Sequence, residues 1–192
     1  MGAHEQADEP TVIMIVRHGE KPTHHSGSAE GVLPDGSRDG QSLTVHGWVR
    51  AGALIELFAP SWGEPPAGLR RPSAVYAASC AGGRSKRALQ TVLPLAARLG
   101  VPVVQRFGHG DEKHLAHELA AGSGVSVVSW HHEGITTLVG HLGEVEPAPP
   151  SEWPDDRFDM VWVFSRDGQA WRFDQVPQLL VSGDLPYPIT EG

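Results

Sequence analysis

Histidine and arginine side chains occur at three points of the sequence, each shortly after an apolar run. The residues are Arg17 and His18 after run 11–16, Arg84 and Arg87 after run 73–79, and His131 and His132 after run 125–129. Phosphoryl transfer needs such a set, because it uses a nucleophile, fixed positive charge on the non-bridging oxygens and an acid for the leaving group. A neutral imidazole is a competent nucleophile near neutral pH, and arginine binds phosphate through two hydrogen bonds without losing its charge. If the fold brings the three points together, the sequence predicts a phosphoryl-transfer site.

The apolar runs have the character of buried strands. Residues 11–16 (TVIMIV) are apolar and rich in β-branched side chains, which is typical of a strand covered on both faces of a parallel sheet. We expect further strands at 73–79, 101–104 and 125–129, and helices at 45–58, 84–99, 111–121 and 133–142. Alternating strands and helices form a mostly parallel sheet with helices on both faces. Ligands bind beyond the carboxyl ends of such strands, so all three points should meet at one edge.

The end of the chain has a different pattern. The apolar segments 160–164 and 170–173 flank Asp167-Gly168, which is typical of a hairpin turn, so antiparallel strands are expected at one edge of the sheet. The segment 147–154 is rich in proline but short, and the sequence shows no repeat. We therefore predict one α/β domain over residues 1–192, with residues 1–10 flexible.

Composition limits the partners. The formal net charge of −8 argues against binding to nucleic acid or to an anionic membrane, because both need a basic face. The expected partner is a small phosphorylated molecule, and the sequence does not indicate an oligomeric state. Cys80 is the only cysteine, so neither an intramolecular disulfide nor a four-thiolate zinc site can form. Residues 1–10 are polar and acidic, unlike a signal peptide or a membrane span, and the expected location is the cytoplasm.

Four segments resemble the motifs of the histidine phosphatase superfamily, also called phosphoglycerate mutase-like. The first is Arg17-His18-Gly19-Glu20, which Lys21 extends to the RHGEK start of a bacterial group of members. Residues 43–51 (LTVHGWVRA) are similar to the family's LTxxGxxQA helix start, residues 87–91 (RALQT) resemble its RAxQT helix, and residues 127–132 (VVSWHH) are placed like its second histidine. The motifs keep the family's order over roughly the first three quarters of the chain.

The resemblance implies a three-layer, phosphoglycerate mutase-like fold and a metal-independent phosphatase without a cofactor. It implies that His18 is the phosphorylated nucleophile, that Arg17 and Arg87 bind phosphate oxygens, and that His132 completes the pocket as a cation. His131 is the alternative second histidine. In the implied cycle His18 attacks phosphorus in line, an acid protonates the departing oxygen, and water hydrolyses the phosphohistidine.

Two departures from the family pattern concern the site. Many members carry Ser or Thr and an Asn shortly after the first motif, whereas Lys21-Pro22-Thr23 follows here, so Lys21 would supply charge instead. The usual glutamate acid follows the third strand, but its setting does not align with residues 104–112 (VQRFGHGDE). Glu112 is the first candidate for the acid, and Asp111 and Glu133 are the alternatives.

The remaining polar residues near the motifs divide into two groups. Glu20 and His131 are expected to contribute with Lys21 to substrate binding. Arg50, Arg84 and His109 are expected to be solvated or structural rather than catalytic.

Two alternative sites use other residues. Cys80 starts a glycine-rich segment like that of a cysteine phosphatase, but Lys86 stands where the Cys-x5-Arg spacing needs arginine. His114 and His117, one helical turn apart and near Glu118, could bind a metal in a hydrolase. Within the resembled family, chain length favours a phosphatase over a phosphoglycerate mutase-type phosphotransferase. A phosphate-binding relative without turnover is the remaining alternative.

Overall fold

The central strand of the sheet is β1 (Val12–Arg17), in which all six residues are buried. The computed structural model describes residues 10–23, 29–168 and 170–191, so the expectation of a flexible start falls almost wholly outside the described residues. β1 runs parallel to β4 (Val125–Trp130) and antiparallel to β6 (Met160–Asp167). Because it has neighbours on both sides and is covered on both faces, β1 needs the continuous apolar run that its sequence shows.

Seven strands of the described chain form one sheet in the order β3-β2-β4-β1-β6-β7-β5. β2 (Ala74–Ala77) and β3 (Val103–Val104) extend the parallel part of the sheet. β6 and β7 (Ala170–Pro177) form the predicted antiparallel hairpin. The outermost position, however, belongs to β5 (Val145–Glu146), which pairs in parallel with β7. The expected α/β sheet is thus confirmed. The additional edge strand β5 has only two residues, too few to show a periodic pattern in the sequence.

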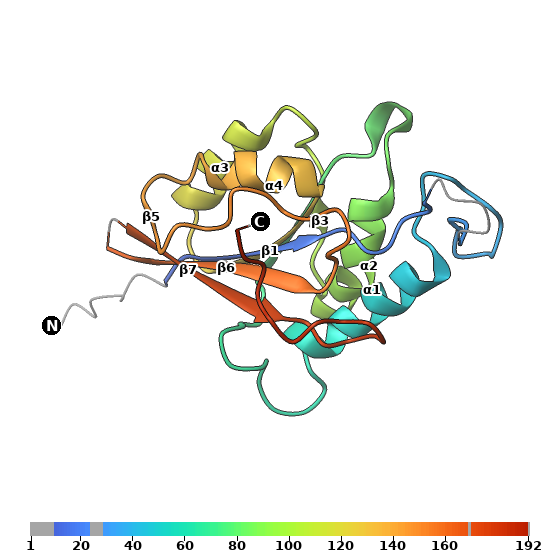
Figure 1. The fold of residues 1–192 in the computed structure, drawn as a ribbon, viewed down its shortest axis with the longest axis horizontal. Coiled ribbons are helices and arrows are strands. Elements are labelled where there is room, and N and C mark those ends of the chain that lie inside the picture. The colour runs from blue at the N-terminus through green and yellow to red at the C-terminus, as the bar shows by residue number, and fades with distance from the viewer. Residues whose placement is uncertain (1–9, 24–28, 169, 192) are drawn as a thin grey trace, which may run out of the picture.

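Two pairs of helices cover the sheet. The helices are α1 (Val45–Phe58), α2 (Arg87–Leu99), α3 (Glu112–Ala121) and α4 (His132–Val139). α1 packs against α2 and α3 packs against α4, and Figure 1 shows the two pairs on opposite sides of the sheet. As predicted, Thr44 caps α1, since its side chain accepts a hydrogen bond from the Gly47 amide at 3.2 Å. Gly100 ends α2 with a φ of 70°, a left-handed conformation that favours glycine.

The start of α2 differs from the prediction. Residues 81–83 form a short 3-10 turn, in which Gly82 and Gly83 have φ values of 72° and 77°. Two consecutive left-handed residues cannot continue an α-helix, so α2 begins at Arg87 rather than at Arg84. Arg84 therefore lies in a loop, while Arg87 stands in the first helical turn.

Aromatic side chains under the hairpin fix a segment that reaches the site. Trp162 of β6 packs against Trp153, with ring centroids 4.9 Å apart, and edge-on against Phe173 of β7 at 5.4 Å. The Trp153 side chain is buried, and its Nε1 donates to the Arg157 carbonyl at 2.8 Å. The connection 153–158 is thereby held against the core instead of hanging in solvent. None of the helices among the described residues is long and apolar enough to cross a membrane.

Candidate active site

The register of the parallel strands brings the segment with Arg17 and His18 next to the segment with His131 and His132. β1 and β4 pair Arg17 with Trp130, and the His18 amide donates to the Trp130 carbonyl at 3.0 Å. The second point joins them through α2, because the Gly19 amide donates to Thr91 Oγ1 at 2.8 Å. The three separate segments therefore meet at the carboxyl ends of the parallel strands, as the sequence predicts.

A cavity of about 500 Å³ opens at this meeting point. Its walls consist of His18, Lys21, Gln41, Gly83, Arg84, Ser85, Arg87, His109, His131, His132 and Glu133. Three fixed cations, from Lys21, Arg84 and Arg87, stand against the single carboxylate of Glu133. The cavity is thus locally basic in a chain whose formal net charge is −8, which is the environment that a phosphate group needs.

The His18 side chain is only 4% exposed, and its tautomer follows from one contact. Its Nδ1 lies 2.8 Å from the Gly19 carbonyl oxygen. Because a carbonyl oxygen only accepts, Nδ1 carries the hydrogen and Nε2 keeps its lone pair. Burial, assisted by the charges of Arg17 and Arg87, lowers the pKa of His18 to about 3. At neutral pH the ring is therefore neutral and its Nε2 can act as a nucleophile.

Arg17 is fully buried, and its guanidinium makes most of its hydrogen bonds within the protein. Its Nη1 donates to the carbonyl oxygens of Pro154, Asp155 and Arg157, and its Nη2 donates to Asp155 Oδ1 at 2.9 Å. Its guanidinium carbon lies 3.9 Å from the centre of the Phe158 ring. Arg17 is not among the residues that line the cavity, but its buried Nε has no hydrogen-bond partner among the described residues. This N–H is therefore a donor of Arg17 that the described residues leave unused.

Arg87 lines the cavity directly. Its Nη2 donates to the Gly40 carbonyl at 2.6 Å, and its Nε lies 3.3 Å from the Ser42 carbonyl. These contacts hold the guanidinium across the cavity wall and leave Nη1 without a hydrogen bond to the described residues. Burial lowers the pKa of Arg87, yet an arginine keeps its charge at any physiological pH.

Arg84 is exposed, as expected, but it also lines the cavity. A Cβ at Gly108 would lie 2.6 Å from Arg84 Nη1, so the end of the Arg84 side chain lies directly against the Gly108 backbone. Sequence reasoning missed this role because it placed Arg84 on a helix rather than in the loop before α2.

Both neighbouring histidines line the cavity, so both alternatives for the second site histidine are present. His131 Nε2 and His132 Nδ1 are buried, and neither has a hydrogen-bond partner among the described residues. Burial lowers the pKa of each ring, and for His132 the positive charge of Arg17 lowers it further. His132 is therefore neutral near pH 7, in contrast to the expected cation, although a bound phosphate dianion would favour protonation.

Asp155 reaches the edge of the cavity from the segment after β5. Its Oδ1 accepts from Lys21 Nζ and from Arg17 Nη2, both at 2.9 Å, and lies 3.5 Å from His132 Nε2. The hydrogen bond from Lys21 is the largest cause that keeps the pKa of Asp155 below its usual range. The sequence offered no signal for this contact, because Asp155 follows a proline-rich connection far from the motifs.

The three candidate acids occupy different places. Glu112 is 5% exposed and does not line the cavity, because its oxygens accept from the Gly110 amide at 2.9 Å and from Trp130 Nε1 at 3.3 Å. Asp111 is held by the Gly108 amide at 2.9 Å and is also absent from the cavity wall. Only Glu133, whose side chain is 74% exposed, stands in the wall.

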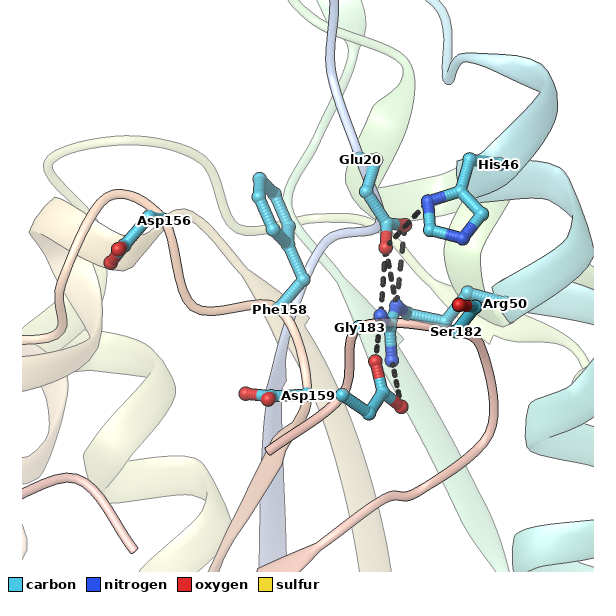
Figure 2. A pocket seen from close by; sticks show the side chains of 9 residues that line it. Glu20, His46, Arg50, Asp156, Phe158, Asp159, Ser182 and Gly183 are labelled. Carbon is cyan, nitrogen blue, oxygen red and sulfur yellow. Dashed lines mark hydrogen bonds and ion pairs between the residues drawn. The ribbon is translucent and has the colours of Figure 1, made fainter. Parts of the chain in front are cut away.

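Glu20 does not line the cavity that contains His18. Figure 2 shows its carboxylate turned toward Arg50 and His46, in a separate pocket of about 240 Å³. Arg50 Nη2 lies 2.7 Å from Glu20 Oε1 and 2.6 Å from Asp184 Oδ1. Of the two expected substrate-binding residues in this segment, Lys21 lines the cavity that contains His18 and Glu20 does not.

The two alternative sites are not assembled around their predicted residues. Cys80 does not line the cavity, and Lys86 forms an ion pair with Asp39 at 2.5 Å. Glu118, near His114 and His117, accepts from the Tyr76 hydroxyl at 3.0 Å and pairs with Arg106. In the part of the chain that the structure describes, no three His, Cys, Asp or Glu side chains are placed to hold a metal ion together.

The fold is similar to solved structures of phosphatases and a mutase. The protein histidine phosphatase SixA, in complex with tungstate, has a TM-score of 0.56 and 18% sequence identity, over 87% of this chain and 97% of that chain. A phosphoglycerate mutase from Bacillus anthracis str. Sterne has a TM-score of 0.50 and 13% identity, over 90% and 95% of the two chains. A phosphoserine phosphatase variant from Entamoeba histolytica, in complex with phosphoserine, has a TM-score of 0.50 and 13% identity, over 84% and 94%.

These neighbours are members of the histidine phosphatase superfamily, and the chain has their phosphoglycerate mutase-like α/β fold. The resemblance that the sequence motifs predicted is thereby confirmed at the level of the fold. No protein-family model matches the chain, and no curated protein matches it in sequence.

Proposed function

We propose that the protein is a metal-independent phosphatase that hydrolyses a phosphate monoester through a phosphohistidine on His18. The observation that carries this proposal is the state of His18: a buried, neutral imidazole whose Nδ1 is committed to the Gly19 carbonyl, in a cavity with three fixed cations. A nucleophile with a free lone pair facing positive charge is what attack on a phosphoryl group requires.

The cavity offers donors for the phosphoryl oxygens. Arg87 and Arg84 supply charge from one wall, and Lys21 supplies it from the other. The unpartnered buried nitrogens of Arg17, His131 and His132 are further positions for phosphate oxygens. Buried polar atoms are normally hydrogen-bonded, so three such atoms around one site favour a polar ligand there.

The neighbours support a small phosphorylated substrate, since one was solved with phosphoserine and another with tungstate, an oxyanion that resembles phosphate. Those ligands belong to those proteins, and the leaving group of this chain's substrate is left open. We also propose that residues 1–192 act as one domain in the cytoplasm, where the free Cys80 would stay reduced.

The test is turnover of p-nitrophenyl phosphate between pH 5 and 8 with excess chelator, for the unmodified protein, His18→Ala and the control His114→Ala. His114 is an exposed histidine outside the cavity, so its replacement should leave the rate unchanged. Chelator-resistant hydrolysis that disappears only with His18→Ala supports the proposal. Equal activity of all three proteins would refute the assignment of His18.

Inactivity of all three proteins would require a binding measurement. Tight binding of inorganic phosphate without hydrolysis would identify a phosphate-binding relative. Transfer of the phosphoryl group to an added alcohol instead of water would identify a phosphotransferase of the mutase type.

A further inference from the structure

His109 lines the same cavity as His18, but the proposed phosphatase mechanism assigns no role to it. It lies in the loop between β3 and α3. Its ring is oriented nearly edge-on to the His131 ring, with centroids 6.1 Å apart and an interplanar angle of 69°. The charge of His131 in turn acts on the pKa of His18, so the three rings are electrostatic neighbours.

The turn that carries His109 is braced on both sides. The Gly108 amide donates to Asp111 Oδ2, and the Asp111 amide donates back to the Gly108 carbonyl, both at 2.9 Å. Gly110 supplies a φ of 97°, and its amide donates to Glu112 Oε2 at 2.9 Å. His109 is thus an exposed side chain on a fixed backbone, which is how a group that must meet a substrate can be held in place.

A buried carboxylate lies behind His109. Glu112 Oε1 is 3.8 Å from His109 Nδ1, which is ion-pair distance, and Trp130 Nε1 holds the same oxygen at 3.3 Å. The carboxylate of Glu112 therefore faces the Nδ1 edge of the His109 ring from the side of the core. Neither ring nitrogen of His109 makes a hydrogen bond to the described residues, and 71% of the side chain is exposed, so a substrate in the cavity can reach the ring.

Glu133 is the other candidate acid in the cavity wall. Its side chain is 74% exposed, close to the 71% of His109, and its Oε1 lies 3.9 Å from His132 Nε2. His109 differs in having a buried carboxylate, that of Glu112, behind its ring, whereas the neighbour of Glu133 is another side chain of the cavity wall.

We propose that His109 is the general acid of this site, with Glu112 as the residue that positions it. The proposal rests on the proposed phosphatase function. In the first step the His18 Nε2 lone pair attacks phosphorus, the bond from phosphorus to the ester oxygen breaks, and its electron pair goes to that oxygen. The oxygen takes the proton from the His109 imidazolium and departs as the alcohol.

In the second step His109, now neutral, takes a proton from water as the water oxygen attacks phosphorus. The nitrogen–phosphorus bond breaks, and its electron pair returns to His18 Nε2. Inorganic phosphate leaves, and His109 is an imidazolium again. Glu112 does not line the cavity, so it acts only through His109.

The first measurement compares two substrates of similar shape, p-nitrophenyl phosphate and phenyl phosphate, in a His109→Asn variant. p-Nitrophenolate leaves without protonation, whereas phenolate is far more basic and needs an acid. kcat/KM covers only the steps up to phosphorylation of His18, so it isolates the departure of the alcohol. We expect kcat/KM to fall about 10²–10⁴-fold for phenyl phosphate, and by less than about threefold for p-nitrophenyl phosphate.

The second measurement uses p-nitrophenyl phosphate alone. The same variant lacks the base for the water step, so kcat and KM should fall together while kcat/KM is preserved. Phosphohistidine should then accumulate in the steady state, which intact-protein mass spectrometry after an alkaline quench detects. A merely structural role of His109 would not give this split.

The matched variants are His114→Asn, an exposed histidine of α3 outside the cavity, and Glu133→Gln. Equal losses on both substrates, or no loss, in His109→Asn would overturn the assignment of His109. A leaving-group-selective loss in Glu133→Gln instead would move the acid to Glu133. Failure of the underlying function is distinct, because it shows as activity of the unmodified protein that survives His18→Ala.

Discussion

The segment Arg17-His18-Gly19-Glu20 divides its side chains between two pockets of opposite character. Around Glu20 the buried carboxylates are matched with a cation, since Arg50 pairs with Glu20 and Asp184 (Figure 2). Arg50 Nη1 also donates to Gln178 Oε1 at 2.8 Å. Around His18, buried nitrogens of Arg17, His131 and His132 have no partner among the described residues. Matched charges stabilise a fold, whereas unmatched polar atoms cost stability and are retained where a ligand completes them.

The largest expected effect is a loss of stability when the ion pairs of the Glu20 pocket are broken. Arg50→Met leaves the carboxylates of Glu20 and Asp184, which are largely buried, without their counter-charge. Removing one partner of a buried ion pair costs about 3–5 kcal/mol of unfolding free energy. Urea unfolding followed by tryptophan fluorescence measures this loss.

The control for that prediction is Arg38→Met, which breaks an exposed pair with Glu30. Exposed pairs contribute less than about 1 kcal/mol, so this variant should unfold almost like the original. If the two variants lose the same small amount, the Glu20 pocket is not a stabilising cluster and the comparison fails.

Arg87→Met tests the unmatched side. The variant removes a cation from the cavity wall but breaks only two contacts to backbone carbonyls. Loss of one preorganised donor to a transition-state oxygen costs about 10²–10³-fold in rate, so kcat/KM should fall by that factor. The unfolding free energy should change by less than about 1 kcal/mol. Arg98→Met, at an exposed position of the same helix, should alter neither quantity.

A pH dependence of stability should follow from the burial of His18. In the unfolded chain the ring has a pKa of about 6.5, whereas in the fold its pKa is about 3. Below about pH 6.5, His18 therefore binds a proton in the unfolded chain but stays neutral in the folded chain. The stabilisation from neutral His18 is complete above that pH and is lost as the pH falls toward 3.

Between pH 6.5 and 5 this loss amounts to about 1.5 kcal/mol for a single site. His18→Asn cannot titrate, so the stability difference between the original protein and the variant should shrink by that amount on acidification. A difference that stays constant over this pH range would mean that His18 is solvated and not the buried neutral base of the comparison.

Much of the fold could be predicted from the sequence, because the residues that define its strands and helix ends lie next to one another in the chain. The apolar run of β1, the cap at Thr44 and the glycine at the end of α2 are each encoded within a few neighbouring residues. The strand ends then place His18 and His131 together, since parallel register leaves little freedom.

The residues that sequence reasoning misplaced depend on contacts between distant segments. Most hydrogen bonds of Arg17 stay within the protein, because carbonyl groups 137 to 140 positions later accept from its guanidinium. Glu20 faces Arg50 because Asp184 completes the cluster from the end of the chain. Arg84 and His109 line the cavity because each lies in a loop whose path is set by glycines rather than by periodicity.

Asp155 links the two sides of the comparison, and its replacement gives the smallest predicted effect. Its side chain is 69% exposed, yet its carboxylate neutralises Arg17 and Lys21 beside the proposed phosphate site. Asp155→Asn should leave stability within about 1 kcal/mol of the original, because the Asp155 side chain is largely exposed and the buried Arg17 keeps its three backbone carbonyl acceptors. It should also release positive charge toward the cavity, so inorganic phosphate should inhibit roughly two- to fivefold more strongly, the equivalent of one exposed ion pair.

Competitive inhibition by phosphate at low and high salt measures this effect, with Asp156→Asn as the neighbouring control in the Glu20 pocket. The gain in Asp155→Asn should shrink at high salt, because screening weakens exposed charges. Weaker phosphate binding in Asp155→Asn would show that the carboxylate matters more for holding Arg17 and His132 in place than for opposing the ligand's charge. In that case Asp155 would belong with Glu20 and Asp184 among the carboxylates that stabilise the fold.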